Sequence, residues 1–137
     1  MSALEAVQAA LAAEQAVVYG YGVVGSHLAK AAETYASDRL TEHLRRRDTL
    51  TTLVTAAGGT PVTARVAYQL PFAVTNAKSA TLLGAHLEQG ANGAYWDLIA
   101  AAVANSPTRS LAIGWLADSA VAANHWGGLQ ALPGQPA

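Results

Sequence analysis

The chain has 137 residues, of which 52% are hydrophobic and 12% are charged, and its formal net charge at pH 7 is −1. This length predicts a single domain over residues 1–137, and the balanced charge excludes a long acidic tail and a broad basic surface for nucleic acid. The sequence contains no cysteine, so disulfides, thiolate metal sites and cysteine nucleophiles are excluded as well.

The N-terminal stretch lacks the pattern of a signal peptide, because Glu5 and Glu14 interrupt it where an uncharged apolar core would stand. No uncharged stretch reaches the roughly 18 residues that a membrane-spanning helix needs. We therefore expect a soluble, cytoplasmic protein that binds neither a membrane nor nucleic acid.

Apolar residues recur every three to four positions in four segments, and much of the apolar content is alanine, which favours helix. These patterns predict an all-α protein. The connection between the first two segments is short, so their helices should be antiparallel neighbours, with Ser37 or Asp38 capping the second. The predicted helices span about residues 4–32, 38–57, 76–104 and 107–126.

A long segment without helical periodicity, about residues 58–75, separates the second and third predicted helices. It contains Gly58, Gly59, Pro61 and Pro71, each of which disfavours a continuous helix. A segment of this length can run along a bundle from one end to the other. The sequence therefore predicts two helical hairpins joined by one long crossover.

The first predicted helix contains the stretch GYGVVG, Gly20 to Gly25, which spells the dinucleotide-binding pattern G-x-G-x-x-G. That pattern needs a preceding strand and free amides at the start of a helix. Here an amphipathic helix precedes the glycines, and amides within a helix are already hydrogen-bonded. The match is interpreted as fortuitous, and the glycines are expected to thin the helix so that a neighbour can approach.

Two acidic residues interrupt apolar stripes, Glu14 in the first helix and Glu88 in the third. Each is followed seven residues later by a tyrosine, Tyr21 and Tyr95, which therefore lies on the same helical face. Burial of an unpaired carboxylate costs several kcal/mol. The pattern indicates one shared polar site; the alternative is that each glutamate faces solvent at the margin of an alanine-rich stripe.

The second and fourth helices also carry polar residues near their stripes, His43 and Arg47 in one and Asp118 and His125 in the other. For His43, a hydrogen-bonded core residue is favoured over a ligand. Whether Asp118 and His125 face the interior stays open, while Arg45 and Arg46 are expected on a solvated face. The predicted buried polar cluster consists of Glu14, Tyr21, His43, Arg47, Glu88 and Tyr95.

This arrangement resembles the ferritin-like superfamily, which builds a di-iron site from single glutamates on two helices and Glu-x-x-His motifs on two others. The stretches AEQAVVYGYGVVG, HLRRRD, AAGGTP and AYQLP look most like an uncharacterised ferritin-like branch known from actinobacterial proteins of unknown function. The resemblance implies a ferritin-like antiparallel four-helix bundle with a long crossover between helices 2 and 3. Glu14 and Glu88 match the two single glutamate ligands.

The two Glu-x-x-His motifs of that family are each half preserved in this chain. His43 matches a motif histidine, but Leu40 stands at the position of its glutamate; Asp118 matches a motif acid, but Val121 stands at the position of its histidine. The resemblance therefore implies a degenerate di-iron site.

Two hypotheses follow for the degenerate site. In the first, the guanidinium of Arg47, aided by His43, has replaced the iron, and no cofactor is expected. In the second, the site still holds an Fe, Mn or Zn ion. The candidate metal ligands are Glu14, His43, Glu88 and Asp118.

The corresponding functional expectation is a non-enzymatic binding, structural or self-associating protein, with a homodimer as the expected assembly. The alternative is a metal-binding redox enzyme or metal-storage-related protein of ferritin-like type. No G-x-S-x-G elbow or comparable hydrolytic constellation competes with these hypotheses. The sequence specifies no small-molecule or protein partner.

Overall fold

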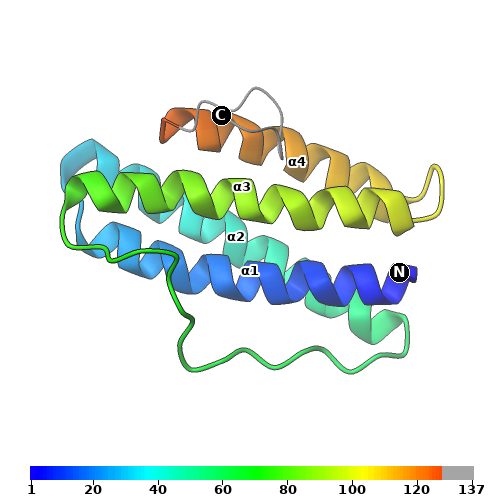
Figure 1. Cartoon of the computed structure of the whole chain (residues 1–137). Coiled ribbons are helices and arrows are strands. Elements are labelled where there is room, and N and C mark those ends of the chain that lie inside the picture. The colour runs from blue at the N-terminus through cyan, green and yellow to red at the C-terminus, as the bar shows by residue number, and fades with distance from the viewer. Residues whose placement is uncertain (128–137) are drawn as a thin grey trace.

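The computed structural model describes residues 1–127 and contains four α-helices, with no strand in that range. The predicted all-α class and four-helix architecture are therefore confirmed. The helices are α1 (Ala3–Ser26), α2 (Lys30–Ala56), α3 (Ala77–Ala101) and α4 (Pro107–His125) (Figure 1).

The helices form two hairpins that pack side by side. Helix α1 packs against α2 and α3, and α3 packs against α4. Figure 1 shows that the segment between α2 and α3 returns along the bundle, so that α3 begins at the same end as α2. Consequently α1 runs antiparallel to both α2 and α3, and α4 runs antiparallel to α3.

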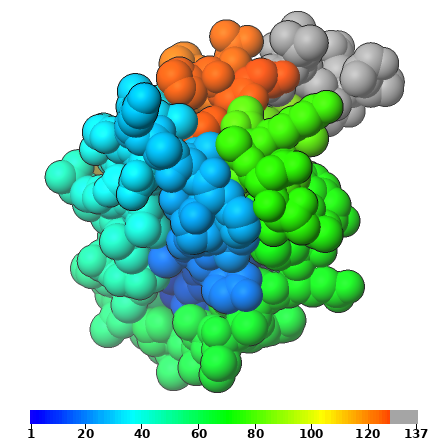
Figure 2. Space-filling view, turned by 90° about the vertical axis from the view of Figure 1, so that its left-hand side faces the viewer, coloured from blue at the N-terminus to red at the C-terminus, as the bar shows by residue number. Residues whose placement is uncertain are grey.

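The crossover, residues 57–76, lies along α1 and is attached to it by hydrogen bonds. The side chain of Gln8 donates to the carbonyl of Thr60 at 2.6 Å and accepts from the amide of Val62 at 2.9 Å, while Gln15 donates to the carbonyl of Val62 at 2.9 Å. Figure 2 shows the crossover (green) wrapped around α1 (blue). The predicted crossover is present, held by polar side chains of the outer face of α1.

Helices α3 and α4 each begin at a capping residue that is recognisable in the sequence. Ser106 caps α4, accepting from the amide of Arg109 at 3.2 Å, and Pro107 occupies the first turn as predicted. Asn76 caps α3 through a reciprocal capping box with Ser79. These caps satisfy the first backbone amides of α3 and α4.

The predicted boundary between the first two helices, residues 32–38, is wrong. Helix α1 ends at Ser26, whose hydroxyl bonds back to the carbonyl of Val23 at 2.7 Å, and α2 already begins at Lys30. The turn is short, with Lys30 at a φ of 55°. The N-cap of α2 is Ala29, which offers no side-chain hydrogen bond, so the sequence gives no capping signal there.

Glycines permit close contacts at two points in the core. A Cβ atom at Gly20 would lie 2.6 Å from a methyl carbon of Leu87, and one at Gly84 would lie 2.8 Å from the ring of Trp126. No atom lies within 4 Å of the corresponding positions at Gly22 and Gly25. Of the three GYGVVG glycines, only Gly20 therefore has the close approach that the sequence predicted.

Within residues 1–127, no helix combines the length and the apolar character needed to cross a membrane.

Candidate functional site

The centre of the bundle is occupied by two carboxylates and an imidazole, all fully buried. The Nδ1 atom of His43 lies 2.5 Å from Oε2 of Glu14, and its Nε2 atom lies 2.8 Å from Oε1 of Glu88. Helix α2 thus places one ring between acids contributed by α1 and α3. Two carboxylates flanking the ring favour the imidazolium form of His43, in which both ring nitrogens donate.

The two tyrosines bond to the glutamate of the opposite helix rather than to their own. Tyr21 of α1 donates to Oε2 of Glu88 at 2.5 Å, and Tyr95 of α3 donates to Oε1 of Glu14. Each helix therefore carries the acid that the other helix's tyrosine satisfies. This crossed arrangement ties α1 to α3 at two levels of the bundle.

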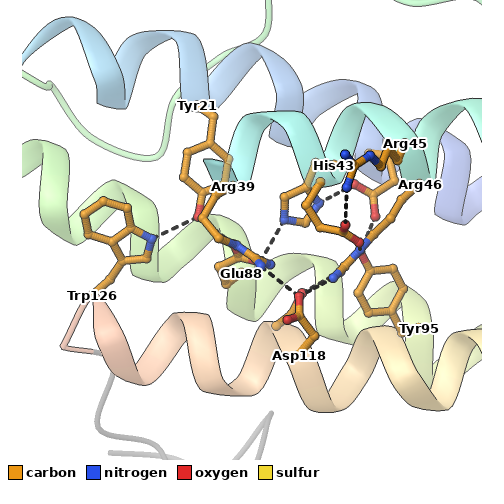
Figure 3. Close-up of polar contacts among 12 residues, drawn as sticks. Tyr21, Arg39, His43, Arg45, Arg46, Glu88, Tyr95, Asp118 and Trp126 are labelled. Carbon is orange, nitrogen blue, oxygen red and sulfur yellow. Dashed lines mark hydrogen bonds and ion pairs between the residues drawn. The ribbon is translucent and has the colours of Figure 1, made fainter. Parts of the chain in front are cut away.

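Arg39 of α2 makes a bidentate ion pair with Glu88. Its Nε and Nη2 atoms donate to the two carboxylate oxygens at 2.8 and 3.1 Å, and its Nη1 atom donates to Oδ2 of Asp118 at 2.8 Å (Figure 3). The bidentate fork suits a planar guanidinium better than an ammonium group. Arg39 therefore links α2 to both helices of the second hairpin.

Arg46 makes the second polar connection between α2 and α4. Its guanidinium donates to Tyr95 Oη at 2.9 Å, to Ser119 Oγ at 2.8 Å and to Glu42 at 2.8 Å, and it also bonds to Asp118 (Figure 3). Arg46 is only 1% exposed, although it is the largest of the fully buried side chains. Its charge is therefore compensated within the protein rather than by solvent.

The hydrogen bonds of the cluster shift the pKa values of His43 and Glu88 toward their charged forms. Burial by itself lowers the pKa of His43, but its hydrogen bonds to Glu14 and Glu88 and their charges outweigh burial and raise that pKa above 6.5. Burial by itself raises the pKa of Glu88, but hydrogen bonds from His43 and Arg39 lower it from 4.5 to about 2.

The two tyrosines remain neutral donors. Burial and the neighbouring glutamates raise the pKa of Tyr21, next to Glu88, and of Tyr95, next to Glu14, well above the ordinary tyrosine value. Tyr21 in turn accepts a hydrogen bond from the indole of Trp126 at 2.9 Å. The phenol oxygens therefore relay hydrogen bonds from Trp126 and Arg46 to the carboxylates.

The structure brings together five of the six residues assigned to the cluster from sequence: Glu14, Tyr21, His43, Glu88 and Tyr95. The placement of Arg47 is wrong. Its side chain is 38% exposed and bonds to the adjacent Asp48 at 3.1 Å, while Arg46, expected in solvent, points into the core.

The predicted buried face of α2 was rotated by one residue from the observed one. The prediction centred that face on Leu40 and Leu44, which are only partly buried. The buried face of α2 instead follows spacings of three or four residues and contains Ala36, Arg39, His43, Arg46, Leu50 and Val54. The spacing of three or four residues that connects Arg39, His43, Arg46 and Leu50 was the available signal, and the greater hydrophobicity of Leu40 and Leu44 obscured it.

The two undecided residues of α4 have different positions. Asp118 reaches the cluster through Arg39 and Arg46, with a side chain that is 49% exposed. His125 does not reach it and stacks on Tyr35, with ring centroids 3.6 Å apart. Asp118 is therefore the solvent-facing edge of the cluster.

The candidate metal ligands do not fit a dinuclear centre in this arrangement. A metal-binding histidine directs one ring nitrogen to the metal, whereas both nitrogens of His43 face carboxylate oxygens. Asp118 is separated from Glu88 by Arg39, which bonds to both. Within residues 1–127, no three His, Asp or Glu side chains are grouped as ligands of one ion.

Comparisons with known proteins cover almost the whole chain. The family model described as a domain of unknown function, DUF4439, matches residues 6–137. The crystal structure of a conserved hypothetical protein, rv2844, from Mycobacterium tuberculosis is similar at 32% identity, covering 93% of this chain and 97% of that chain, with a TM-score of 0.84. No curated protein matches. The shared unit is therefore the complete bundle.

Proposed function

Because this chain belongs to the DUF4439 family, whose description assigns no role, we propose its function from the geometry of the buried cluster. We propose that it is a ferritin-like bundle in which one imidazolium and two guanidinium groups take the place of a metal centre. Its role would then be that of a structural, self-associating protein rather than a redox enzyme.

The observation that carries this proposal is the position of His43 between Glu14 and Glu88, with hydrogen bonds of 2.5 and 2.8 Å. Glutamates on α1 and α3 stand where the ferritin-like plan puts single ligands, and the ring fills the space between them. The three side chains are fully buried, so a substrate has no access to them without separation of the helices.

The outer face of the α3–α4 hairpin supports a role in self-association. On α3, Leu82 and Trp96 are 53% and 49% exposed, and Val103, just after the end of α3, is 72% exposed. On α4, Ile113 and Val121 are 50% and 70% exposed. Exposed large apolar side chains that gather in a patch mark interaction sites, and these five all belong to one hairpin.

The charge pattern favours a second copy of this chain as the occupant of that face. Between Arg109 and His125, Asp118 is the only charged residue, and glycine and alanine separate the large apolar side chains of α4. Small residues allow two such helices to approach closely, and a face with few charges can match itself under two-fold symmetry. We therefore propose a homodimer formed through α3 and α4.

Metal analysis tests the first half of the proposal. Protein purified without a chelating tag is expected to contain no stoichiometric metal, and titration with Fe(II) or Zn(II) should show no saturable site. A stoichiometric metal that is lost in Glu14→Ala and Glu88→Ala would overturn the proposal in favour of a metal-binding protein.

The oligomeric state tests the second half. We expect a dimer in sedimentation equilibrium, and Trp96→Ser combined with Ile113→Ser should weaken it at least 30-fold, or about 2 kcal/mol. Val66→Ser is the matched control, because Val66 is fully exposed on the crossover, away from this face. A wild-type protein that stays monomeric at all concentrations rejects the dimer.

A further inference from the structure

A partly open cavity of about 270 Å³ lies between the two central helices and the crossover. Helix α1 contributes Ala13, Ala16 and Val17 to its wall, and α3 contributes His86, Leu87, Gly90 and Ala91. The crossover closes one side with residues 68–71. This cavity shares no residue with the buried ion-pair cluster, so its role is independent of the proposed function.

The cavity exists because the helices present small residues where they face each other. Ala13 and Ala16 of α1 face Gly90 and Ala91 of α3. A Cβ atom at Gly90 would have no other atom within 4 Å, so the space beside it is open. Larger side chains at these positions would fill the volume with ordinary core packing.

Leu87, the largest aliphatic side chain that α3 contributes to the cavity wall, packs against α1. Its methyl carbons lie over Gly20, 2.6 and 2.7 Å from where a Cβ atom would stand. Because Gly20 has no side chain, Leu87 can pack directly against α1 at the wall of the cavity. This gives the first glycine of GYGVVG a specific effect on the shape of the cavity.

The crossover wall is fixed rather than free to collapse. Tyr68 packs on Tyr19 with ring centroids 5.7 Å apart, and the carbonyl of Val62 accepts a hydrogen bond from Gln15 at 2.9 Å. At the floor, Val17 and Ala91 are 4% and 1% exposed. A preformed wall reduces the ordering cost that binding would otherwise carry.

The lining defines the chemistry of a ligand. No Asp, Glu, Lys or Arg side chain lines the cavity, and its polar side-chain groups come from Tyr68, Gln69 and His86. His86 is oriented by an edge contact with Phe72, whose ring centroid lies 6.3 Å away. An apolar cavity of about 150 Å³ is known to hold benzene, so this volume suits a bicyclic ring.

We propose that this cavity is a binding site for a small neutral aromatic molecule of one or two rings. Its ring would lie between the alanines of α1 and Gly90, with a single polar atom directed to Gln69 or His86. Such sites combine apolar walls with a few polar groups that set the orientation.

Indole is a suitable probe, because it has two fused rings and one N–H group. Titration monitored by methyl chemical shifts is expected to show saturable binding, with the largest changes at Val17, Leu70 and Leu87. Gly90→Leu should weaken binding more than tenfold by filling the cavity, and its open surroundings permit the larger side chain to fold.

Gly22→Leu is the matched control, because Gly22 is also a helical glycine with no neighbour within 4 Å but lies outside the cavity. It should bind indole within twofold of the wild type. Gly20→Ala should weaken binding by displacing Leu87 into the cavity.

Absence of saturable binding to the wild type would overturn the proposal, as would undiminished binding to Gly90→Leu. Shifts confined to Ile113 and Val121 would mean adsorption to the outer face of α3 and α4, and would overturn it too.

Discussion

The two helical hairpins carry the same pair of residues but compensate charge differently. Helices α1 and α3 each bury a glutamate and, seven residues later, a tyrosine. Their partner helices differ: α2 contributes every cation of the cluster, whereas α4 contributes Asp118 and Ser119. Both hairpins therefore contribute a buried glutamate, but only the first hairpin contributes cations to the cluster.

This asymmetry shows how the hairpins recognise each other. The α1–α2 hairpin brings Arg39, His43 and Arg46 against one fully buried acid, Glu14, while the α3–α4 hairpin brings Glu88 and Asp118 without a cation in the cluster. Separately, each hairpin would bury uncompensated charge or leave it in water. Docking pairs the cations of the first hairpin with the acids of the second, and charge complementarity thus adds specificity to the apolar packing.

The outer surfaces of the two hairpins also differ in their content of charged side chains. The second hairpin exposes Leu82, Trp96, Val103, Ile113 and Val121, all with at least 49% of their surface accessible. Helix α2 instead exposes charged side chains, including Arg45 at 75% and Asp48 at 72%. The hairpin without internal cations is therefore also the one whose exterior is suited to association.

We expect the largest effect from a substitution in α2 that removes a cation of the cluster. Arg46→Leu should lower the free energy of unfolding by about 3–5 kcal/mol, because it leaves Asp118, Tyr95 and Ser119 without their common donor. Urea unfolding measures the change. Arg47→Leu, at the next position but on the surface, should alter stability by less than about 0.5 kcal/mol. Equal losses in the two variants would contradict the assignment.

Tyr95→Phe and Tyr21→Phe compare the two glutamate–tyrosine pairs directly. Each should cost about 1.5–3 kcal/mol, because a buried carboxylate loses a donor. The loss should be greater for Tyr95, whose oxygen also accepts from Arg46, than for Tyr21, which accepts from a neutral indole. Chemical denaturation measures both, with Tyr19→Phe as the control. A neutral Tyr95→Phe would refute the crossed arrangement.

The stability of the protein should depend on pH differently through His43 of the first hairpin and Glu88 of the second. The pKa of His43 is raised in the folded state, so its contribution is complete below 6.5 and is lost as the pH rises through the raised value. The pKa of Glu88 is lowered, so its contribution is complete above 4.5 and is lost as the pH falls toward about 2.

We therefore expect maximal stability between about pH 4.5 and 6.5, measured as melting temperature across the range. His43→Gln should remove the decline on the alkaline side, whereas His27→Gln, in the α1–α2 turn, should preserve it. An alkaline decline that persists in His43→Gln would assign it to another group.

The smallest expected effect compares a glycine in each hairpin. Gly22→Ala should raise stability by about 0.5–1 kcal/mol, since α1 gains a better helix former in open space. Gly84→Ala should lower stability, because its Cβ atom would lie 2.8 Å from the rigid ring of Trp126. Thermal melts of the two variants in parallel measure the difference, and a stabilising Gly84→Ala would contradict this packing.

The sequence by itself determined the helical class, the crossover and which glutamate and tyrosine share a face of one helix. Alanine-rich periodicity predicts helices, and clustered glycine and proline predict the interruption between α2 and α3. The seven-residue separation of Glu14 from Tyr21, and of Glu88 from Tyr95, places each pair on one face. These properties depend only on residues that are near one another along the chain, so the sequence specifies them.

Only the tertiary structure decided which guanidinium compensates the buried acids and which tyrosine meets which glutamate. Arg46 and Arg47 differ by about 100° around α2, and the rotation of that helix is set by its packing against α1 rather than by its own sequence. Likewise, Tyr21 bonds to Glu88 of α3 rather than to Glu14 of its own helix. Charge compensation in this bundle is a relation between helices, and it becomes defined only when the two hairpins dock.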